Sequence, residues 1–215
     1  MKSNQLLIFD LDDTIFETKS MGQLPVESIL SKFKASIRSA FKMEEVDLIV
    51  SDLWKYPFDY VSEKYNLNDS IKQQFSNSIN ELDYQLEIAP FSDYELVRNY
   101  AVRKVLVTTG FKKLQLAKIS ALNLENEFEE IHIDEIDDTH RLYKKGIFER
   151  LVNSINKDLR DFLVIGDNPE SEIKAGNELG LTTVQVAKFG QPKSSHAHYY
   201  IQHYQELIQI LEERA

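Results

Sequence analysis

The chain has 215 residues, of which 42% are hydrophobic and 28% are charged, a balance that supports a packed core and excludes a disordered chain. The formal net charge of -10 makes the overall field repel nucleic acid and anionic lipid, so a small anionic substrate would need local cations or a metal ion. The absence of cysteine excludes disulfides, thiolate chemistry and cysteine-ligated zinc, and no apolar run approaches the roughly 20 residues of a membrane span.

Short, continuous apolar runs recur along the chain and predict strands that are buried on both faces of a sheet. In chain order these runs cover residues 6–9, 104–107, 161–165 and 182–186, with weaker candidates at 130–133 and 199–201. Helical spacing of apolar residues lies between them, at 112–122, at 147–155 and from about residue 203 onward. Strands that alternate with helices predict an α/β fold with a doubly wound, Rossmann-like parallel sheet.

Residues 16–90 interrupt this alternation, because they show helical spacing but no convincing strand. Two apolar stripes indicate two helices with a common core; they are formed by Ile29, Phe33, Ile37 and Phe41 and by Ile71, Phe75, Ile79 and Leu82. We therefore expect an α/β core made of residues 1–15 and 91–215. A small all-helical insertion, residues 16–90, would follow the first strand and join the core through short hinges near Phe16 and Pro90.

An aromatic segment inside the insertion has two interpretations. It contains Trp54, Tyr56, Phe58 and Tyr60 and is interrupted by Pro57. Aromatic residues in a small helical unit usually form its core, but these residues could equally line a surface that faces the substrate. The sequence leaves both interpretations open.

Polar residues follow three of the predicted strands, and the carboxyl ends of parallel strands meet at one edge of a sheet. Asp10 and Asp12 follow the first strand, Thr108 the second, and Asp167 the strand after that. Two carboxylates in one pocket can divide the work of a nucleophile and a general acid and base. Asp167 would add an oxygen ligand for Mg²⁺, while Thr108 and Lys144 would bind phosphoryl oxygens.

These segments resemble, in order, the four motifs of the haloacid dehalogenase superfamily. The segments are 9–14 (FDLDDT), 107–110 (VTTG), the lysine pair 144–145 and 165–173 (IGDNPESEI). The resemblance implies that Asp10 is the nucleophile and that Asp12 is the general acid and base. It further implies phosphate binding by Lys144 and by Thr108, Thr109 and Gly110, and Mg²⁺ held by Asp10, Asp167 and the main-chain carbonyl of Asp12. The helical insertion resembles the C1 cap of the superfamily.

The sequence departs from the family pattern at two places. Glu172 stands where the fourth motif usually has a second aspartate, so it could touch the metal through water or orient a ligand. The third motif lacks its usual Lys-Pro pair, which leaves Lys144 and Lys145 as competing candidates. We prefer Lys144 because of its distance from Phe148 and the helix that follows.

We therefore expect a phosphatase that hydrolyses a small phosphorylated metabolite through an aspartyl-phosphate on Asp10. Asp12 favours phosphoryl transfer over dehalogenation, because the leaving group of a phosphate ester needs a proton. A phosphomutase of the same superfamily, or a non-catalytic binding protein on the same scaffold, is the alternative. We expect a soluble, cytoplasmic protein with no membrane partner, and the sequence does not indicate its oligomeric state.

Overall fold

The structure of the protein is a computed structural model that describes residues 4–21, 24–53, 56, 58–138, 140–188 and 193–214. For residues 24–26, 28 and 29 it describes the backbone alone. Trp54, Pro57 and the side chain of Ile29, which the sequence analysis singled out, therefore lie outside the described residues.

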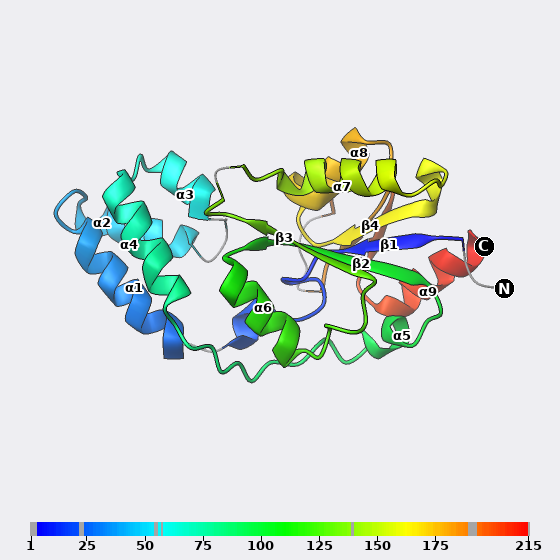
Figure 1. Ribbon diagram of the computed structural model, residues 1–215, viewed down its shortest axis with the longest axis horizontal. Helices are drawn as coiled ribbons and strands as arrows, with labels where there is room; N and C mark the ends of the chain where they lie inside the picture. The colour runs from blue at the N-terminus through cyan, green and yellow to red at the C-terminus, as the bar shows by residue number, and fades with distance from the viewer. Residues whose placement is uncertain are drawn as a thin grey trace.

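A parallel sheet forms the centre of the molecule, as the sequence predicted (Figure 1). In the described residues it has six strands in the order β3-β2-β1-β4-β5-β6. Their bounds are β1 Leu6–Phe9, β2 Arg103–Gly110, β3 Glu130–Glu135, β4 Phe162–Gly166, β5 Thr182–Val186 and β6 Tyr199–Ile201. Each neighbouring pair is parallel, which confirms the doubly wound α/β class.

Helices cover both faces of this sheet (Figure 1). One face carries α7 Tyr143–Ser154 and α8 Lys174–Glu178, and the other carries α5 Glu95–Arg98, α6 Lys112–Ala121 and α9 Tyr204–Glu213. Leu6 and Ile8 of β1 pack in the apolar cluster of the first face, whereas Leu7 and Phe9 pack in the cluster of the second. A strand that is apolar on both sides is thus buried on both sides.

The regular elements of the described residues between β1 and β2 are helices, apart from two isolated bridges. Residues 82–89, at the end of the expected insertion, form neither helix nor strand. It contains a 3-10 turn, Thr18–Met21, followed by α1 Leu24–Ile37, α2 Met43–Asp52, α3 Phe58–Lys64 and α4 Asp69–Asn80. The predicted stripes meet in an apolar cluster that includes Phe33, Ile37, Ile71, Phe75 and Ile79 and that also takes in Phe111 at the start of α6. Helices α1 to α4 thus pack together at the left of Figure 1, and their apolar cluster continues into the α/β part of the molecule.

The two chain segments that join the insertion to the sheet run side by side. Phe16 forms an antiparallel bridge with Pro90, and the Phe91 N–H donates a hydrogen bond of 2.8 Å to the Ile15 carbonyl oxygen. The entry and the exit of the insertion are thus tied together at the residues where the sequence analysis placed hinges.

Three elements are longer than their apolar patterns predicted. β2 continues through Thr108 to Gly110 and β3 continues to Glu135, because the two strands go on pairing after their side chains become polar. α7 begins at Tyr143 rather than at residue 147, which places Lys144 in its first turn. Backbone hydrogen bonding extends these elements beyond the apolar residues by which a sequence pattern is recognised.

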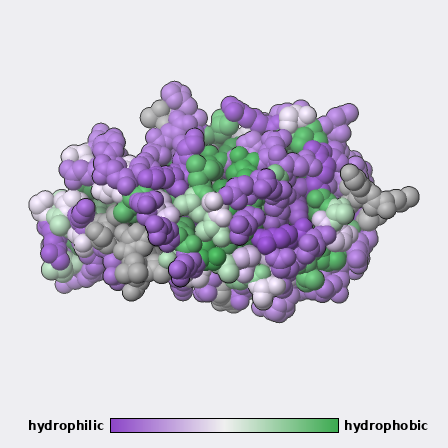
Figure 2. Space-filling view, turned by 60° about the horizontal axis from the view of Figure 1, so that its bottom comes forward, coloured by the Kyte–Doolittle hydropathy of each residue, from purple (hydrophilic) through white to green (hydrophobic). Residues whose placement is uncertain are grey.

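The surface is largely hydrophilic on the face that Figure 2 presents, with apolar side chains gathered near the middle of that face. Among the described residues, no helix combines the length and the apolar character that crossing a lipid bilayer would require.

Candidate active site

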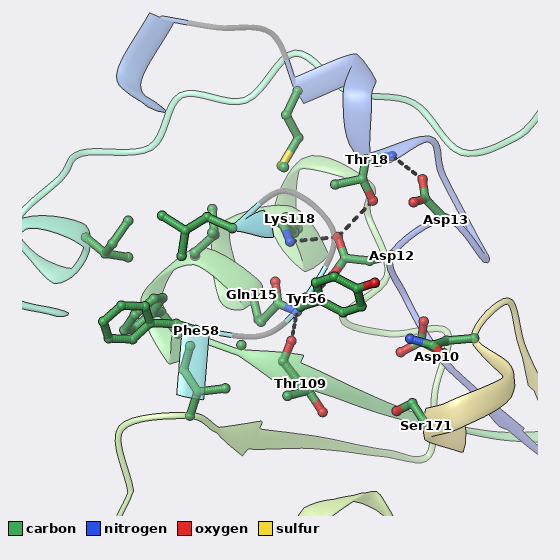
Figure 3. A pocket seen from close by; sticks show the side chains of 18 of the residues that line it. Asp10, Asp12, Asp13, Thr18, Tyr56, Phe58, Thr109, Gln115, Lys118 and Ser171 are labelled. Atoms are coloured by element: carbon green, nitrogen blue, oxygen red, sulfur yellow. Dashed lines mark hydrogen bonds and ion pairs between the residues drawn. The ribbon is translucent and has the colours of Figure 1, made fainter. Parts of the chain in front are cut away.

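A cavity of about 300 Å³ lies at the carboxyl ends of β1, β2 and β4, bounded on its other side by the helical insertion. The register pairs Phe9 with both Leu106 and Ile165, so the residues that follow these strands share one edge of the sheet. Most of the predicted site residues line this cavity, namely Asp10, Asp12, Thr109, Gly110, Lys144, Asp167 and Glu172 (Figure 3). Thr108 is not among its lining residues.

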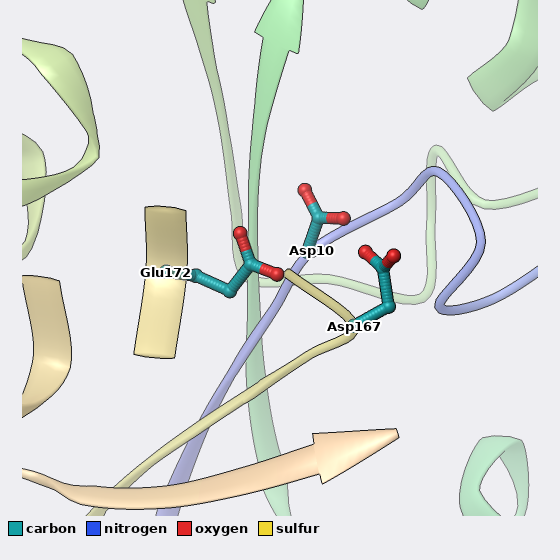
Figure 4. Close-up of side chains that lie close together, drawn as sticks. All are labelled: Asp10, Asp167 and Glu172. Carbon is teal, nitrogen blue, oxygen red and sulfur yellow. The ribbon is translucent and has the colours of Figure 1, made fainter. Parts of the chain in front are cut away.

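Three carboxylates gather at the base of the cavity. Asp10, Asp167 and Glu172 each have an oxygen within 4.8 Å of an oxygen of the other two (Figure 4). Burial raises the pKa of Asp10 to about 7; Lys144 opposes this effect, and Glu172 and Asp12 add to it. Burial, together with the charges of Glu172 and Asp10, raises the pKa of Asp167 to about 9. The cluster therefore holds more negative charge than its surroundings neutralise.

Lys144 is the cation that reaches this cluster. Its ammonium nitrogen lies 2.7 Å from Asp10 Oδ1 and 2.6 Å from Glu172 Oε2, and its side chain is only 8% exposed. Burial opposes the charged form, but the two carboxylates outweigh burial and raise the pKa of Lys144 above its usual range. Lys145 instead extends outward, with a side chain 52% exposed that pairs with Glu178 at 2.7 Å. The fold thus brings Lys144 to Asp10 and directs Lys145 away from it.

Glu172 is fully engaged by protein groups. Its Oε2 accepts the hydrogen bond from Lys144, and its Oε1 accepts one of 2.6 Å from the Asn168 N–H. The side chain folds over Gly166, where an added Cβ would lie 2.2 Å from Glu172 Cγ. The glycine at the end of β4 therefore permits the close approach of Glu172. These contacts favour a role for Glu172 in orienting Lys144 and the loop after β4.

Asp12 lies at the rim of the cavity, and two residues of α6 hold its side chain. Lys118 Nζ lies 2.7 Å from Asp12 Oδ1, and Gln115 Nε2 donates a hydrogen bond of 3.0 Å to Asp12 Oδ2 (Figure 3). Thr18 Oγ1 is 3.4 Å from Asp12 Oδ1. The carboxylate of Asp12 is therefore turned toward α6 and is not part of the close cluster of Asp10, Asp167 and Glu172.

Gln115 also connects the second motif to Asp12. Its amide nitrogen lies 2.6 Å from Thr108 Oγ1 and 2.9 Å from the Thr109 carbonyl oxygen. Gln115 passes close to Gly110, where an added Cβ would meet its Cδ at 2.9 Å. The Thr108 hydroxyl is buried beneath Gln115, whereas Thr109 and Gly110 line the cavity.

The residues present fit a hard divalent cation. Mg²⁺ prefers a few carboxylate oxygens together with water and phosphate oxygens. Asp10 and Asp167 supply such oxygens, and the raised pKa of each comes mainly from burial, with a smaller contribution from neighbouring carboxylates; a bound cation would favour the ionised forms against both effects. The side-chain oxygens of Asp12 are occupied by Lys118 and Gln115, which agrees with the main-chain carbonyl as the atom that the family resemblance assigns to the metal.

The sequence analysis did not single out Gln115 and Lys118. They stand three residues apart and so share one face of α6, which begins directly after the second motif. Both side chains are buried, and that burial is what distinguishes them from the other polar residues of this helix. The burial of these two side chains cannot be predicted from a local sequence pattern.

Comparison with known proteins agrees with this geometry. Residues 5–180, more than half of the chain, match the family model of haloacid dehalogenase-like hydrolases. A glyceraldehyde 3-phosphate phosphatase from Pyrococcus abyssi is 25% identical over 199 residues, which cover 87% of this chain and 82% of that protein.

Two solved structures share the fold. A HAD phosphatase from Thermococcus onnurineus superposes with a TM-score of 0.64 at 18% identity, covering 96% of this chain and 97% of its own. The HAD-hydrolase YfnB from Bacillus subtilis, bound to magnesium, superposes with a TM-score of 0.61 at 20% identity, covering 96% and 98%. The chain therefore belongs to the haloacid dehalogenase-like hydrolases, a family of enzymes.

Proposed function

We propose that the protein is a phosphatase that hydrolyses the phosphomonoester of a small metabolite. The observation that carries this proposal is the meeting of Asp10, Lys144 and Asp167 in one buried cluster at the carboxyl edge of the sheet. The glyceraldehyde 3-phosphate phosphatase to which the chain is similar supports the same reaction class.

Asp10 is the nucleophile in this proposal. One of its carboxylate oxygens attacks the phosphorus, the bond from phosphorus to the ester oxygen breaks, and Asp12 gives a proton to the departing alcohol. Asp12 then accepts a proton from the water that attacks the phosphorus of the aspartyl-phosphate, which releases inorganic phosphate and restores Asp10. The ammonium of Lys144 neutralises charge that develops on the phosphoryl oxygens.

Asp10 and Asp167 would hold Mg²⁺, together with the main-chain carbonyl of Asp12. When bound, the ion would neutralise negative charge on the carboxylates and on the phosphate. Glu172 would support the site through its contacts with Lys144 and the Asn168 N–H. Thr109 and Gly110 would face the phosphate from the end of β2, and Thr108 would act through Gln115.

Residues 16–90 are the C1 cap in this proposal, and residues 1–15 and 91–215 are the hydrolase core. The packing of α1 to α4 around a common apolar cluster and the bridge between Phe16 and Pro90 support this division. A cytoplasmic location is part of the same proposal, and a chain without cysteine is compatible with a reducing compartment.

The proposal is tested by release of inorganic phosphate from phenyl phosphate, a phosphomonoester whose leaving group takes up a proton, in the presence and absence of Mg²⁺. Wild-type protein should release phosphate only with the metal, and Asp10→Asn and Asp12→Asn should each lose at least about a hundredfold in kcat. Asp47→Asn is the matched control, because that carboxylate lies on the insertion with a side chain 64% exposed. Undiminished turnover in Asp12→Asn would remove Asp12 from its proposed role.

A second assay of phosphate release, with a sugar phosphate as the substrate, separates the phosphatase from a phosphomutase. A mutase returns the phosphoryl group to an organic acceptor, so it would consume a sugar phosphate without releasing inorganic phosphate. Phosphate that accumulates in proportion to the substrate consumed supports hydrolysis.

A further inference from the structure

The cavity above Asp10 has two chemically different ends. Its charged lining residues all come from residues 10–13 or from residues 118–172, on the side of the sheet. The described lining residues between positions 21 and 84 are all apolar or aromatic, and they all come from the insertion, residues 16–90. Figure 3 shows Phe58 at one side of the cavity and Asp10 at the other.

Three phenylalanine rings form the wall at the apolar end. The ring centroids of Phe58 and Phe75 lie 4.6 Å apart, and each lies 6.0 Å from the ring of Phe111. Tyr84 adds a ring whose hydroxyl donates a hydrogen bond of 2.6 Å to the Ile79 carbonyl oxygen, so this polar atom already has a partner within the protein. The wall therefore offers aromatic surface and little hydrogen-bonding capacity.

The two lysines that line the cavity both form ion pairs with carboxylates of the protein. Lys118 pairs with Asp12 at 2.7 Å, and Lys144 pairs with Asp10 and Glu172. Among the described lining residues, no other lysine or arginine faces the cavity. A second anionic group on the substrate would therefore enter an apolar space without a counter-ion, which is costly.

We propose that the preferred substrate is the monophosphate of an uncharged, largely apolar alcohol, with an aromatic or alkyl group that rests on the phenylalanine wall. This inference rests on the proposed phosphatase function and adds to it the chemical class of the leaving group. A volume of about 300 Å³ lies at the lower end of small-molecule sites, so the substrate is compact. Burying apolar atoms against such a wall favours this group over a polyol of similar length.

A matched pair of substrates tests the inference. 2-Phenylethyl phosphate and glycerol 3-phosphate are both primary alkyl monophosphates, so they differ mainly in the polarity of the leaving group. We expect kcat/KM with Mg²⁺ to be at least tenfold higher for 2-phenylethyl phosphate, and higher also than for 3-phosphoglycerate and glyceraldehyde 3-phosphate. An equal or reversed preference, with phenyl phosphate still hydrolysed, would overturn the inference and leave the phosphatase function standing. No release of phosphate from any of these compounds would overturn both.

Two leucine variants test the preference at the apolar end of the cavity, which the phenylalanine wall and insertion residues such as Leu82 line together. Leu82 lines the cavity, whereas Leu48 lies on α2, is 58% exposed and is not among the lining residues. Leu82→Gln should lower the ratio of the two kcat/KM values by at least fivefold, and Leu48→Gln should leave it unchanged. The ratio is independent of the fraction of active protein, so partial misfolding does not affect it. A ratio that Leu82→Gln leaves at the wild-type value would place the preference elsewhere and contradict the proposed wall.

Discussion

The ammonium of Lys118 lies 2.7 Å from Asp12 Oδ1, although 106 positions separate the two residues in the chain. Lys118 reaches Asp12 from the middle of α6, and its side chain is 6% exposed. The ion pair fixes the carboxylate that we propose as general acid and base, which makes Lys118 a positioning residue.

Lys118→Met should lower kcat by about 10- to 100-fold, because proton transfer depends on the placement and protonation of Asp12. Lys118→Arg should restore part of the activity, since it keeps a cation that can hold the Asp12 carboxylate. Lys113→Met, on the exposed side of α6, is the control. An unchanged kcat in Lys118→Met would show that the ion pair has no part in the reaction.

Lys144 and Lys145 provide a second comparison, because they are adjacent and differ in their surroundings. Lys144→Ala should lower kcat/KM by at least about a hundredfold, since it removes the buried cation next to Asp10. Lys145→Ala should stay within about twofold of wild type, because an exposed ion pair with Glu178 contributes little. Steady-state kinetics of both variants test whether Lys144 or Lys145 binds the phosphate. A larger loss of kcat/KM in Lys145→Ala would assign that role to Lys145.

Gly166 is predicted to tolerate no side chain while Glu172 is present. An added Cβ would lie 2.2 Å from Glu172 Cγ, so Gly166→Ala should lower the free energy of unfolding by about 1–3 kcal/mol, as overpacking does. Urea denaturation measures this change. In the background of Glu172→Ala the same substitution should cost much less, because the clashing side chain is absent. Equal costs in the two backgrounds would assign the destabilisation to another cause.

Mg²⁺ should raise the melting temperature of the protein, and the apparent affinity should increase with pH. The pKa of Asp10 is raised to about 7 and that of Asp167 to about 9, so both carboxyls carry protons over part of the neutral range in the absence of metal. Binding requires their ionised forms and therefore becomes tighter as the pH rises from about 6 to about 9. Thermal denaturation with increasing Mg²⁺ at several pH values measures this, with Asp167→Asn as the variant that should lose the shift. A wild-type response that is independent of pH would contradict the proposed ligands.

Asp93 links Lys188 and α9, and its contribution to stability should depend on pH. Partial burial opposes its ionisation, but hydrogen bonds from Lys188 and from the Tyr204 N–H outweigh burial and hold the pKa of Asp93 below its usual range. A folded pKa below the unfolded value gives stability that is complete above pH about 4 and is lost as the pH falls through the folded pKa.

Asp93→Asn should therefore lower the free energy of unfolding by about 1–3 kcal/mol at neutral pH, and the difference from wild type should shrink below pH about 4. Urea denaturation over this pH range measures both effects. Asp47→Asn, whose partner Lys34 is also exposed, should change stability by less than about 1 kcal/mol. A difference for Asp93→Asn that stays constant down to pH about 3 would contradict the ionised pair as its cause.

The sequence by itself determined the alternation of strands and helices around the sheet, the helical character of much of the segment after the first strand and most of the acidic residues of the site. Continuous runs of residues such as 6–9 and 182–186 form strands that are buried on both faces. Such runs are typical of the central strands of a parallel sheet, so the sequence alone predicts the sheet. Asp10 and Asp167 could be assigned to one site because parallel strands end at a common edge.

Only the tertiary structure decided which polar side chains turn inward. Lys144 and Lys145 have the same local chemistry, and the packing of α7 against the sheet separates them. Gln115 and Lys118 meet Asp12 across 103 and 106 positions, through the approach of α6 to the loop after β1. Phe58 both packs in the core of the insertion and lines the cavity, and Tyr56 also lines it, so neither simple interpretation of the aromatic segment describes it fully. These outcomes depend on long-range packing, which the spacing of residues along one helix or strand does not encode.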